Sequence, residues 1–208
     1  TFNYDASEVM SCGGRFEILG NHTDHNHGLC LAATCDLAIY GALAKRDDNL
    51  VNFVSKGYTP FHIDLSDLEI KQEEINKSAG LVRGVARYLH DRNYRIGGFD
   101  IYTDSLIFPG AGVSSSAAFE LLVAEIFNHL FNKNSVDKML LCKAGQYAEN
   151  DYFGKKSGLL DQIGVGYGNV VSIDFENITS PLVKEIKFPF EDIHFVIVNT
   201  GGSHAELS

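Results

Sequence analysis

The sequence lacks any apolar run that approaches the roughly 20 residues needed to span a bilayer. The amino end, residues 1–5, does not resemble a signal peptide. There is also no CxxC pair, and the four cysteines are too few and too scattered for a disulfide-stapled secreted fold: Cys12, Cys30, Cys35 and Cys142. We therefore expect a globular cytoplasmic protein with reduced, mostly buried thiols and no membrane partner.

Basic tracts are absent as well. The chain carries 17 lysines and arginines against 27 aspartates and glutamates, which gives a net charge of −10. No stretch alternates basic and aromatic residues in the way that nucleic-acid surfaces do, so we expect no nucleic-acid partner. The length of 208 residues and the 45% hydrophobic content suit one large domain with its own core.

The hydrophobic pattern predicts an α+β domain that is rich in strands first, helical in the middle and rich in strands again. Expected strands cover 8–19, 29–45, 51–54, 61–65, 99–103, 170–175, 183–188 and 195–199. Expected helices cover 75–89, 117–131, 136–152 and a short piece within 158–168. The run 29–45 is apolar almost throughout, which predicts a strand buried on both faces. Ser135 is the expected N-cap of the third helix.

A glycine- and serine-rich loop, residues 109–118, joins a strand-like segment to a helix-like one. Glycines allow a tight turn, and the free N–H groups and the dipole at the start of a helix attract anions. The loop therefore predicts a phosphate site made by Gly110, Ala111, Gly112, Val113, Ser114, Ser115 and Ser116. In a protein of net negative charge, such a site also predicts Mg²⁺.

The composition of this loop also fits other structures. An ordinary strand-to-helix connection with a serine N-cap has the same composition. No Gly-Lys-Ser/Thr ends the loop, so it is not a Walker motif, and Ser115 stands where a dinucleotide fingerprint has its third glycine. A phosphate loop of another class remains.

A dense polar loop, residues 21–28, follows the first expected strand. It contains His22, His25 and His27, but they lack helical i, i+4 pairing or a cysteine or glutamate partner at ligand spacing, which disfavours zinc. Short side chains of Asn, His, Thr and Asp offer directional donors and acceptors that suit hydroxyl groups. The loop therefore predicts a sugar or polyol site.

Two carboxylates near the end of the helical region differ in their surroundings. Glu149 lies close to the end of an expected helix, where a glutamate is ordinarily solvated. Asp161 lies among apolar residues, where an unpaired carboxylate is costly. Arg15 is the partner we predict for Asp161, because a guanidinium stays charged and keeps the aspartate ionised.

Three of these stretches resemble the signatures of the galactokinases among the GHMP small-molecule kinases. Residues 14–26 are similar to the sugar signature, 109–118 to the ATP loop and 149–162 to the catalytic segment. Residues 199–204, Asn-Thr-Gly-Gly-Ser-His, are similar to the family's Asn-Thr-Gly-x-Ser-His. The resemblance implies a GHMP-kinase N-terminal domain over 1–208, with a mixed sheet that has helices on one face, like domain 2 of ribosomal protein S5. It also implies a C-terminal domain that this chain does not contain.

The resemblance further implies ATP-dependent phosphorylation of a sugar at its anomeric hydroxyl, with galactose as the leading expected substrate. Asp161 would accept the proton or orient the hydroxyl, and Arg15 would polarise the site. Contacts to the sugar would come from Asn21, His22, Asp24 and Gly158. The backbone of 110–116 would hold the ATP phosphates, and Ser116 with Glu149 would bind Mg²⁺.

The sugar signature departs from the family at Asn21. Galactokinases usually have glutamate where this chain has Asn21, so an anionic acceptor is replaced by an amide that also donates. Asn21 therefore leaves open that the protein is a kinase of another sugar, such as N-acetylgalactosamine, arabinose or a uronic acid. The resemblance also leaves open a non-catalytic sugar sensor, because galactokinase-like proteins include such regulators.

Overall fold

A computed structural model describes residues 2, 4–20, 23–108, 110–187 and 194–198 of the chain. The strands are β1 Glu8–Leu19, β2 Leu29–Lys45, β3 Leu50–Ser55, β4 Phe61–Asp64, β5 Phe99–Ser105, β6 Val170–Asp174 and β7 Leu182–Ile186. The α-helices are α1 Ser78–His90, α2 Ser115–Asn132, α3 Lys138–Tyr147 and α4 Leu160–Gly166. Shorter elements are the 3₁₀ turns η1 Asp24–Asn26 and η2 Gln72–Glu74, and the π-helix η3 Ala148–Phe153. The predicted α+β class is confirmed.

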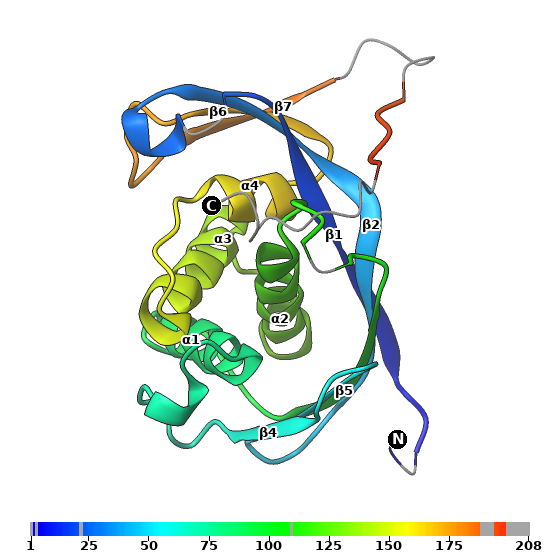
Figure 1. The fold of residues 1–208 in the computed structure, drawn as a ribbon. Helices are drawn as coiled ribbons and strands as arrows, with labels where there is room; N and C mark the ends of the chain where they lie inside the picture. Colours follow the sequence, from blue (N-terminus) through cyan, green and yellow to red (C-terminus); the bar gives the residue numbers. More distant parts are fainter. Residues whose placement is uncertain (1, 3, 21–22, 109, 188–193, 199–208) are drawn as a thin grey trace.

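The long strand β2 organises a seven-stranded mixed sheet with the order β4-β3-β5-β2-β6-β7 (Figure 1). β1 pairs with β2 over most of its length, so β5 and β6 share the other edge of β2. β6 pairs with residues 29–33 of β2, and β5 pairs with residues 39–45 of β2. Among the strands that the structure describes, β3 and β5 pair in parallel and the other pairs are antiparallel.

The helices lie within the concave side of the curved sheet, as Figure 1 shows. Their apolar residues and the inward side chains of the strands form one core, in which Phe53, Phe99, Leu121 and Phe127 are at most 1% exposed. The prediction that β2 is buried on both faces is wrong. Its burial alternates, with Tyr40 44% exposed, because helices cover only one face of the sheet.

The start of α3 also differs from the prediction. The N-cap is Asp137, whose carboxylate accepts from the N–H groups of Met139 and Leu140, and not Ser135. Val136 is buried and donates its N–H to the Asn128 side chain over 3.0 Å, so a tertiary contact takes the position where the helix was expected to begin. The expected helix 136–152 then continues beyond α3 as the π-helix η3.

The strand expected over 195–199 is not formed in residues 195–198, and Asn199 lies outside the described residues. A strand needs a neighbour with which to exchange backbone hydrogen bonds, and none of the described strands pairs with this segment. A run of β-branched and aromatic residues, Phe-Val-Ile-Val, was a misleading signal here. The motif at 199–204 likewise falls outside the described part of the chain.

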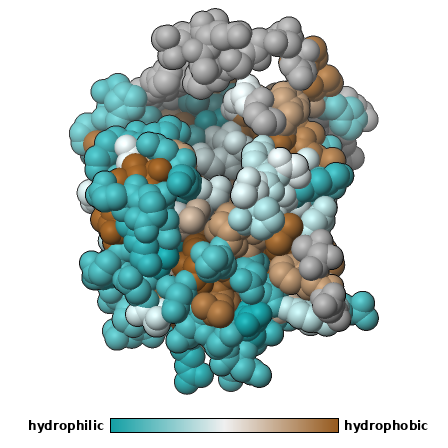
Figure 2. All heavy atoms as spheres, turned by 60° about the horizontal axis from the view of Figure 1, so that its bottom comes forward, coloured by the Kyte–Doolittle hydropathy of each residue, from teal (hydrophilic) through white to brown (hydrophobic). Residues whose placement is uncertain are grey.

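Figure 2 shows a face on which hydrophilic residues form much of the described surface, with apolar residues in separate smaller patches between them. Among the described residues, no helix combines the length and the apolar character that crossing a membrane requires. The four cysteines are free thiols, with Cys30 and Cys142 buried and the other two partly so.

Candidate active site

Arg15 lies where the pairing of β1 with β2 becomes irregular. The register of the two strands shifts between Gly13 and Arg15, and the Arg15 N–H donates to the Val113 carbonyl over 3.0 Å. At Gly14 a Cβ would lie 2.5 Å from the same carbonyl oxygen, so only glycine allows β1 to approach the loop this closely. The irregularity changes the direction of the arginine side chain. The hydrogen bond from Arg15 to Val113 joins the strand directly to the predicted phosphate loop.

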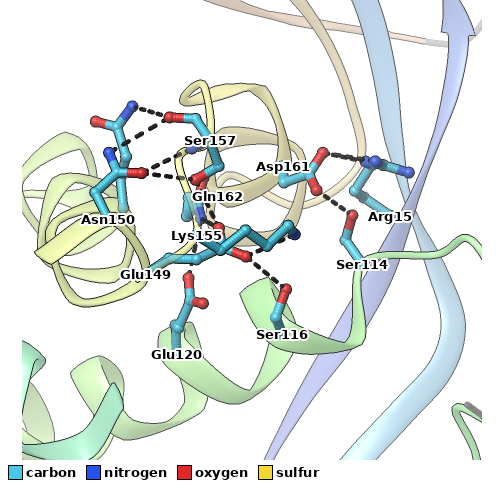
Figure 3. A network of polar contacts seen from close by, with 11 residues as sticks. Arg15, Ser114, Ser116, Glu120, Glu149, Asn150, Lys155, Ser157, Asp161 and Gln162 are labelled. Carbon is cyan, nitrogen blue, oxygen red and sulfur yellow. Dashed lines mark hydrogen bonds and ion pairs between the residues drawn. The ribbon is translucent and has the colours of Figure 1, made fainter. Parts of the chain in front are cut away.

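Arg15 and Asp161 form the ion pair that the sequence predicts, although 146 residues separate them (Figure 3). Nε and Nη2 of Arg15 both donate to Asp161 Oδ1, over 2.9 and 2.5 Å. Nη1 donates to the Gly112 carbonyl over 3.0 Å, and the Ser114 hydroxyl donates to Asp161 Oδ2 over 2.6 Å. Both carboxylate oxygens are therefore fixed, while 29% of the Asp161 side chain stays exposed to a ligand.

The predicted phosphate loop wraps the start of α2. Gly110, Gly112 and Ser114 all have positive φ, at 77°, 71° and 56°. The backbone N–H groups of 112–116 donate to no described residue, and the 18-residue helix directs its positive end at them. The loop thus offers unsatisfied donors within reach of the Arg15 guanidinium, as an anion site requires.

Glu149 lies in the π-helix η3, at the other end of this network. Its side chain is only 2% exposed. Oε1 accepts from the Ser116 hydroxyl over 3.2 Å, and Oε2 accepts from Ser157 over 2.6 Å and from the Gln162 amide over 3.2 Å. The structure therefore brings together Ser116 and Glu149, the two residues predicted to share a metal ion. The expectation that Glu149 resembles an ordinary solvated carboxylate is wrong.

A second buried carboxylate lies behind Glu149. The Gln162 amide also donates to Glu120 over 2.9 Å, and both Glu120 and Gln162 have no exposed surface. Burial, aided by the charge of Glu149, raises the pKa of Glu120 well above its usual range. One oxygen each of Glu120 and Gln162 has no partner among the described residues, so protein groups satisfy the polar layer behind Glu149 only in part.

Lys155 supplies a second cation to the site. Its ammonium donates to Glu149 Oε1 over 2.9 Å. Burial opposes the charged form of Lys155, but the hydrogen bond and the charge of Glu149, with help from Asp161 and Glu120, outweigh it and raise the pKa of the lysine. Figure 3 shows the lysine side chain reaching along Glu149 toward Ser116.

The predicted sugar loop meets the catalytic segment at Asp24. A Cβ on Gly158 would collide with the Asp24 carboxylate, so the two residues are in direct contact. Asn21 and His22 lie outside the described residues. His25 Nδ1 lies 3.0 Å from Asp24 Oδ1, and His27 Nδ1 lies 2.9 Å from the Glu176 carbonyl, so these two histidines turn to separate partners.

Sequence reasoning missed several members of the network. Glu120 lies four residues after Ser116, on the same side of α2, so helical spacing was a usable signal. Gln162 directly follows Asp161 in the first turn of α4. Nothing in the sequence marks Lys155, because its contact depends on the course of the chain after the π-helix.

Comparisons with known proteins agree with this geometry. Residues 80–169 match the family described as GHMP kinases N terminal domain, and residues 1–45 match the galactokinase galactose-binding signature. The chain is 36% identical to a galactokinase of Clostridium tetani over 155 residues, which is 74% of this chain and 39% of that protein. It is 31% identical to a galactokinase of Lactobacillus helveticus over 98% of this chain and 53% of that protein.

Solved structures give the same result. The crystal structure of Lactococcus lactis galactokinase complexed with galactose superposes with a TM-score of 0.76 at 29% identity, covering 88% of this chain and 48% of that one. Methanococcus jannaschii mevalonate kinase shares the fold, with a TM-score of 0.70 at 15% identity over 89% of this chain and 57% of that one. The chain thus spans about half the length or less of the curated relatives named above, from 39% to 53%. It belongs to the galactokinases of the GHMP kinase family and has the fold of that family's N-terminal domain.

Proposed function

We propose that the protein to which this chain belongs transfers the γ-phosphoryl group of ATP to the anomeric hydroxyl of a monosaccharide, with galactose as the leading substrate. The observation that carries the proposal is the Arg15–Asp161 pair, linked by Ser114 to the loop at the start of α2. Asp161 would contact the acceptor hydroxyl, and Arg15 and the loop beside it would contact the phosphate. The galactokinase names of the relatives support the choice of sugar.

In the proposed reaction, Asp161 receives or orients the proton of the anomeric hydroxyl through the face that is not held by Arg15 and Ser114. Arg15 contacts Asp161 and the Gly112 carbonyl of the loop. Its positive charge would therefore lie close to the phosphoryl group during the transfer. Phosphoryl transfer goes through a loose transition state in which positioning and charge neutralisation matter most. Asp24 and Gly158, which touch each other, would form the sugar side of the site.

We also propose ATP and Mg²⁺ as its cosubstrate and cofactor. Mg²⁺ prefers oxygen ligands and commonly takes one or two from the protein together with phosphate oxygens. Ser116 Oγ and Glu149 Oε1, 3.2 Å apart, are a donor set that fits this preference. When bound there, the metal would neutralise charge on the ATP phosphates. The N–H groups of 112–116 would hold the same phosphates from the helix side.

The test is ADP release by the full-length protein over a panel of sugars. Galactose should give the highest kcat/KM, and its product should be the 1-phosphate. No ADP release with any sugar would favour the alternative of a non-catalytic sensor.

Asn21 supports a second candidate, a kinase of another sugar. An amide accepts through one oxygen and donates through its N–H groups, so it favours a substrate group that can accept. Replacing one charge-assisted bond costs about 1.5–3 kcal/mol. If galactose is not the best substrate, N21E should raise kcat/KM for galactose relative to the preferred sugar by about tenfold or more. If galactose is already the best substrate and N21E is neutral or harmful, this candidate fails.

A further inference from the structure

Lys155 is anchored twice on the residue that we propose as a metal ligand. Its backbone N–H donates to the Glu149 carbonyl over 3.0 Å, and its ammonium donates to Glu149 Oε1 over 2.9 Å. The two side chains differ sharply in exposure, with 59% for Lys155 and 2% for Glu149. The lysine therefore covers the carboxylate from the solvent side.

The ammonium contacts the same carboxylate oxygen that the Ser116 hydroxyl contacts. Glu149 Oε2 already accepts from Ser157 and Gln162, so it is turned into the protein. Oε1 accepts from Lys155 and from the Ser116 hydroxyl. A divalent cation bound by Ser116 and Glu149 must use Oε1, and it would meet the ammonium at that atom.

Displaced from Oε1, the ammonium would remain at the phosphate side of the site. The charges of Asp161 and Glu120 help that of Glu149 to raise the pKa of Lys155. A lysine carries a compact charge on a flexible stem and binds phosphate as a point charge. The N–H groups of 112–116 lie at the start of α2, beside Ser116. Phosphate oxygens that they bind would therefore lie near the Lys155 ammonium.

We propose that Lys155 is a phosphate-binding residue that rests on Glu149 in the place of the metal until nucleotide and metal arrive. The proposal rests on the proposed function only in taking the site to bind ATP and a divalent cation. It makes a reciprocal prediction. Removing the ammonium should strengthen binding of the metal alone and weaken binding of ATP alone, whereas a purely structural role would move both affinities in the same direction.

The chain offers a matched control in the next residue. Lys156 is 82% exposed, and its one ion pair within the described residues is with Asp151, at 3.8 Å, which is itself 44% exposed. K156M therefore removes the same charge from the same loop without touching Glu149. K155R keeps a cation at the site and serves as the conservative rescue.

The experiment uses full-length protein in four forms: wild type, K155M, K155R and K156M. Binding of Mn²⁺ without nucleotide is measured by electron paramagnetic resonance, and binding of ATP in the presence of EDTA is measured by calorimetry. K155M should bind Mn²⁺ about threefold to fivefold more tightly and ATP about threefold to fivefold more weakly, the range of one partly exposed charge pair. K155R and K156M should stay within about twofold of wild type for ATP.

Two results would overturn the proposal: K155M binding Mn²⁺ no more tightly than K156M, including no detectable Mn²⁺ binding by either, or K155M retaining the wild-type affinity for ATP. Neither measurement needs a sugar or turnover. If no sugar is phosphorylated but both affinities change as expected, the proposed activity fails and the role of Lys155 stands.

Discussion

Two carboxylate–cation pairs serve the candidate site, and they are built differently. In the first, Arg15 directs two N–H groups at one oxygen of Asp161, and the guanidinium side chain is 14% exposed. In the second, the 59% exposed Lys155 covers the buried Glu149. A planar guanidinium fork loses less freedom per bond than a flexible ammonium. The first pair is suited to hold one geometry and the second to exchange partners, which fits phosphoryl transfer at one end and metal and phosphate exchange at the other.

The largest effect should come from the first pair. D161N keeps the shape of the side chain but removes its charge beside Arg15, so kcat should fall by about 10²-fold or more while the sugar still binds. Steady-state kinetics and sugar titration of the full-length protein measure both. D151N is the control, because the Asp151 side chain is 44% exposed and, among the described residues, its carboxylate forms an ion pair with Lys156 alone. A D161N variant that keeps more than about a tenth of the wild-type kcat would contradict the assigned role.

A smaller change is expected at the second pair. E149Q keeps the hydrogen-bonding shape but removes the charge that we propose for the metal, so half-maximal turnover should need about tenfold more Mg²⁺. A magnesium titration of the rate measures this, and E185Q on the exposed pair with Lys138 is the control. An altered sugar preference in E149Q would show that the proposed metal site is wrong.

The contact between the sugar loop and the catalytic segment should give a smaller effect again. In G158A the new methyl group would press on the Asp24 carboxylate. Overpacking costs about 1–3 kcal/mol, so KM for the sugar should rise about fivefold or more. K156A, in the same loop, should leave it unchanged. If KM for ATP rises and that for the sugar does not, Asp24 and Gly158 belong to the nucleotide side.

The smallest effect concerns the buried layer behind Glu149. Because the pKa of Glu120 is raised in the folded state, its contribution to stability is present below its unfolded pKa and is lost as the pH rises through the folded one. E120Q removes this titration. Between about pH 5 and about pH 8 the free energy of unfolding should fall less with rising pH in E120Q than in wild type. Urea denaturation at a series of pH values measures this. Parallel pH profiles would show that the pKa of Glu120 is not raised in the folded state.

The sequence predicted the first pair better than the second. Asp161 stands among apolar residues and needed a buried cation, and Arg15 was available on an apolar strand, so burial cost alone was sufficient to pair them. Both long strands were also predicted with the bounds that the structure has, Glu8–Leu19 and Leu29–Lys45. The exposed outer face of β2 was missed, because apolar composition does not reveal which face of a sheet stays uncovered.

The second pair was predicted only in part. Ser116 and Glu149 came from the family resemblance, but the contact of Lys155 with Glu149 depends on a π-helix whose residues, Ala148–Phe153, read as ordinary helix. The Ser135 cap failed for a related reason. A buried contact of Val136 with Asn128 moved the helix start to Asp137, and single-sequence patterns do not contain such tertiary contacts.

The division of work between the two pairs is tested most directly by binding without turnover. Full-length D161N and E149Q are titrated separately with galactose and with Mn²⁺ by calorimetry. The account predicts that D161N binds both ligands within about threefold of wild type, whereas E149Q keeps its galactose affinity and loses Mn²⁺ affinity by about tenfold. Loss of Mn²⁺ binding in D161N, with E149Q unaffected, would contradict it.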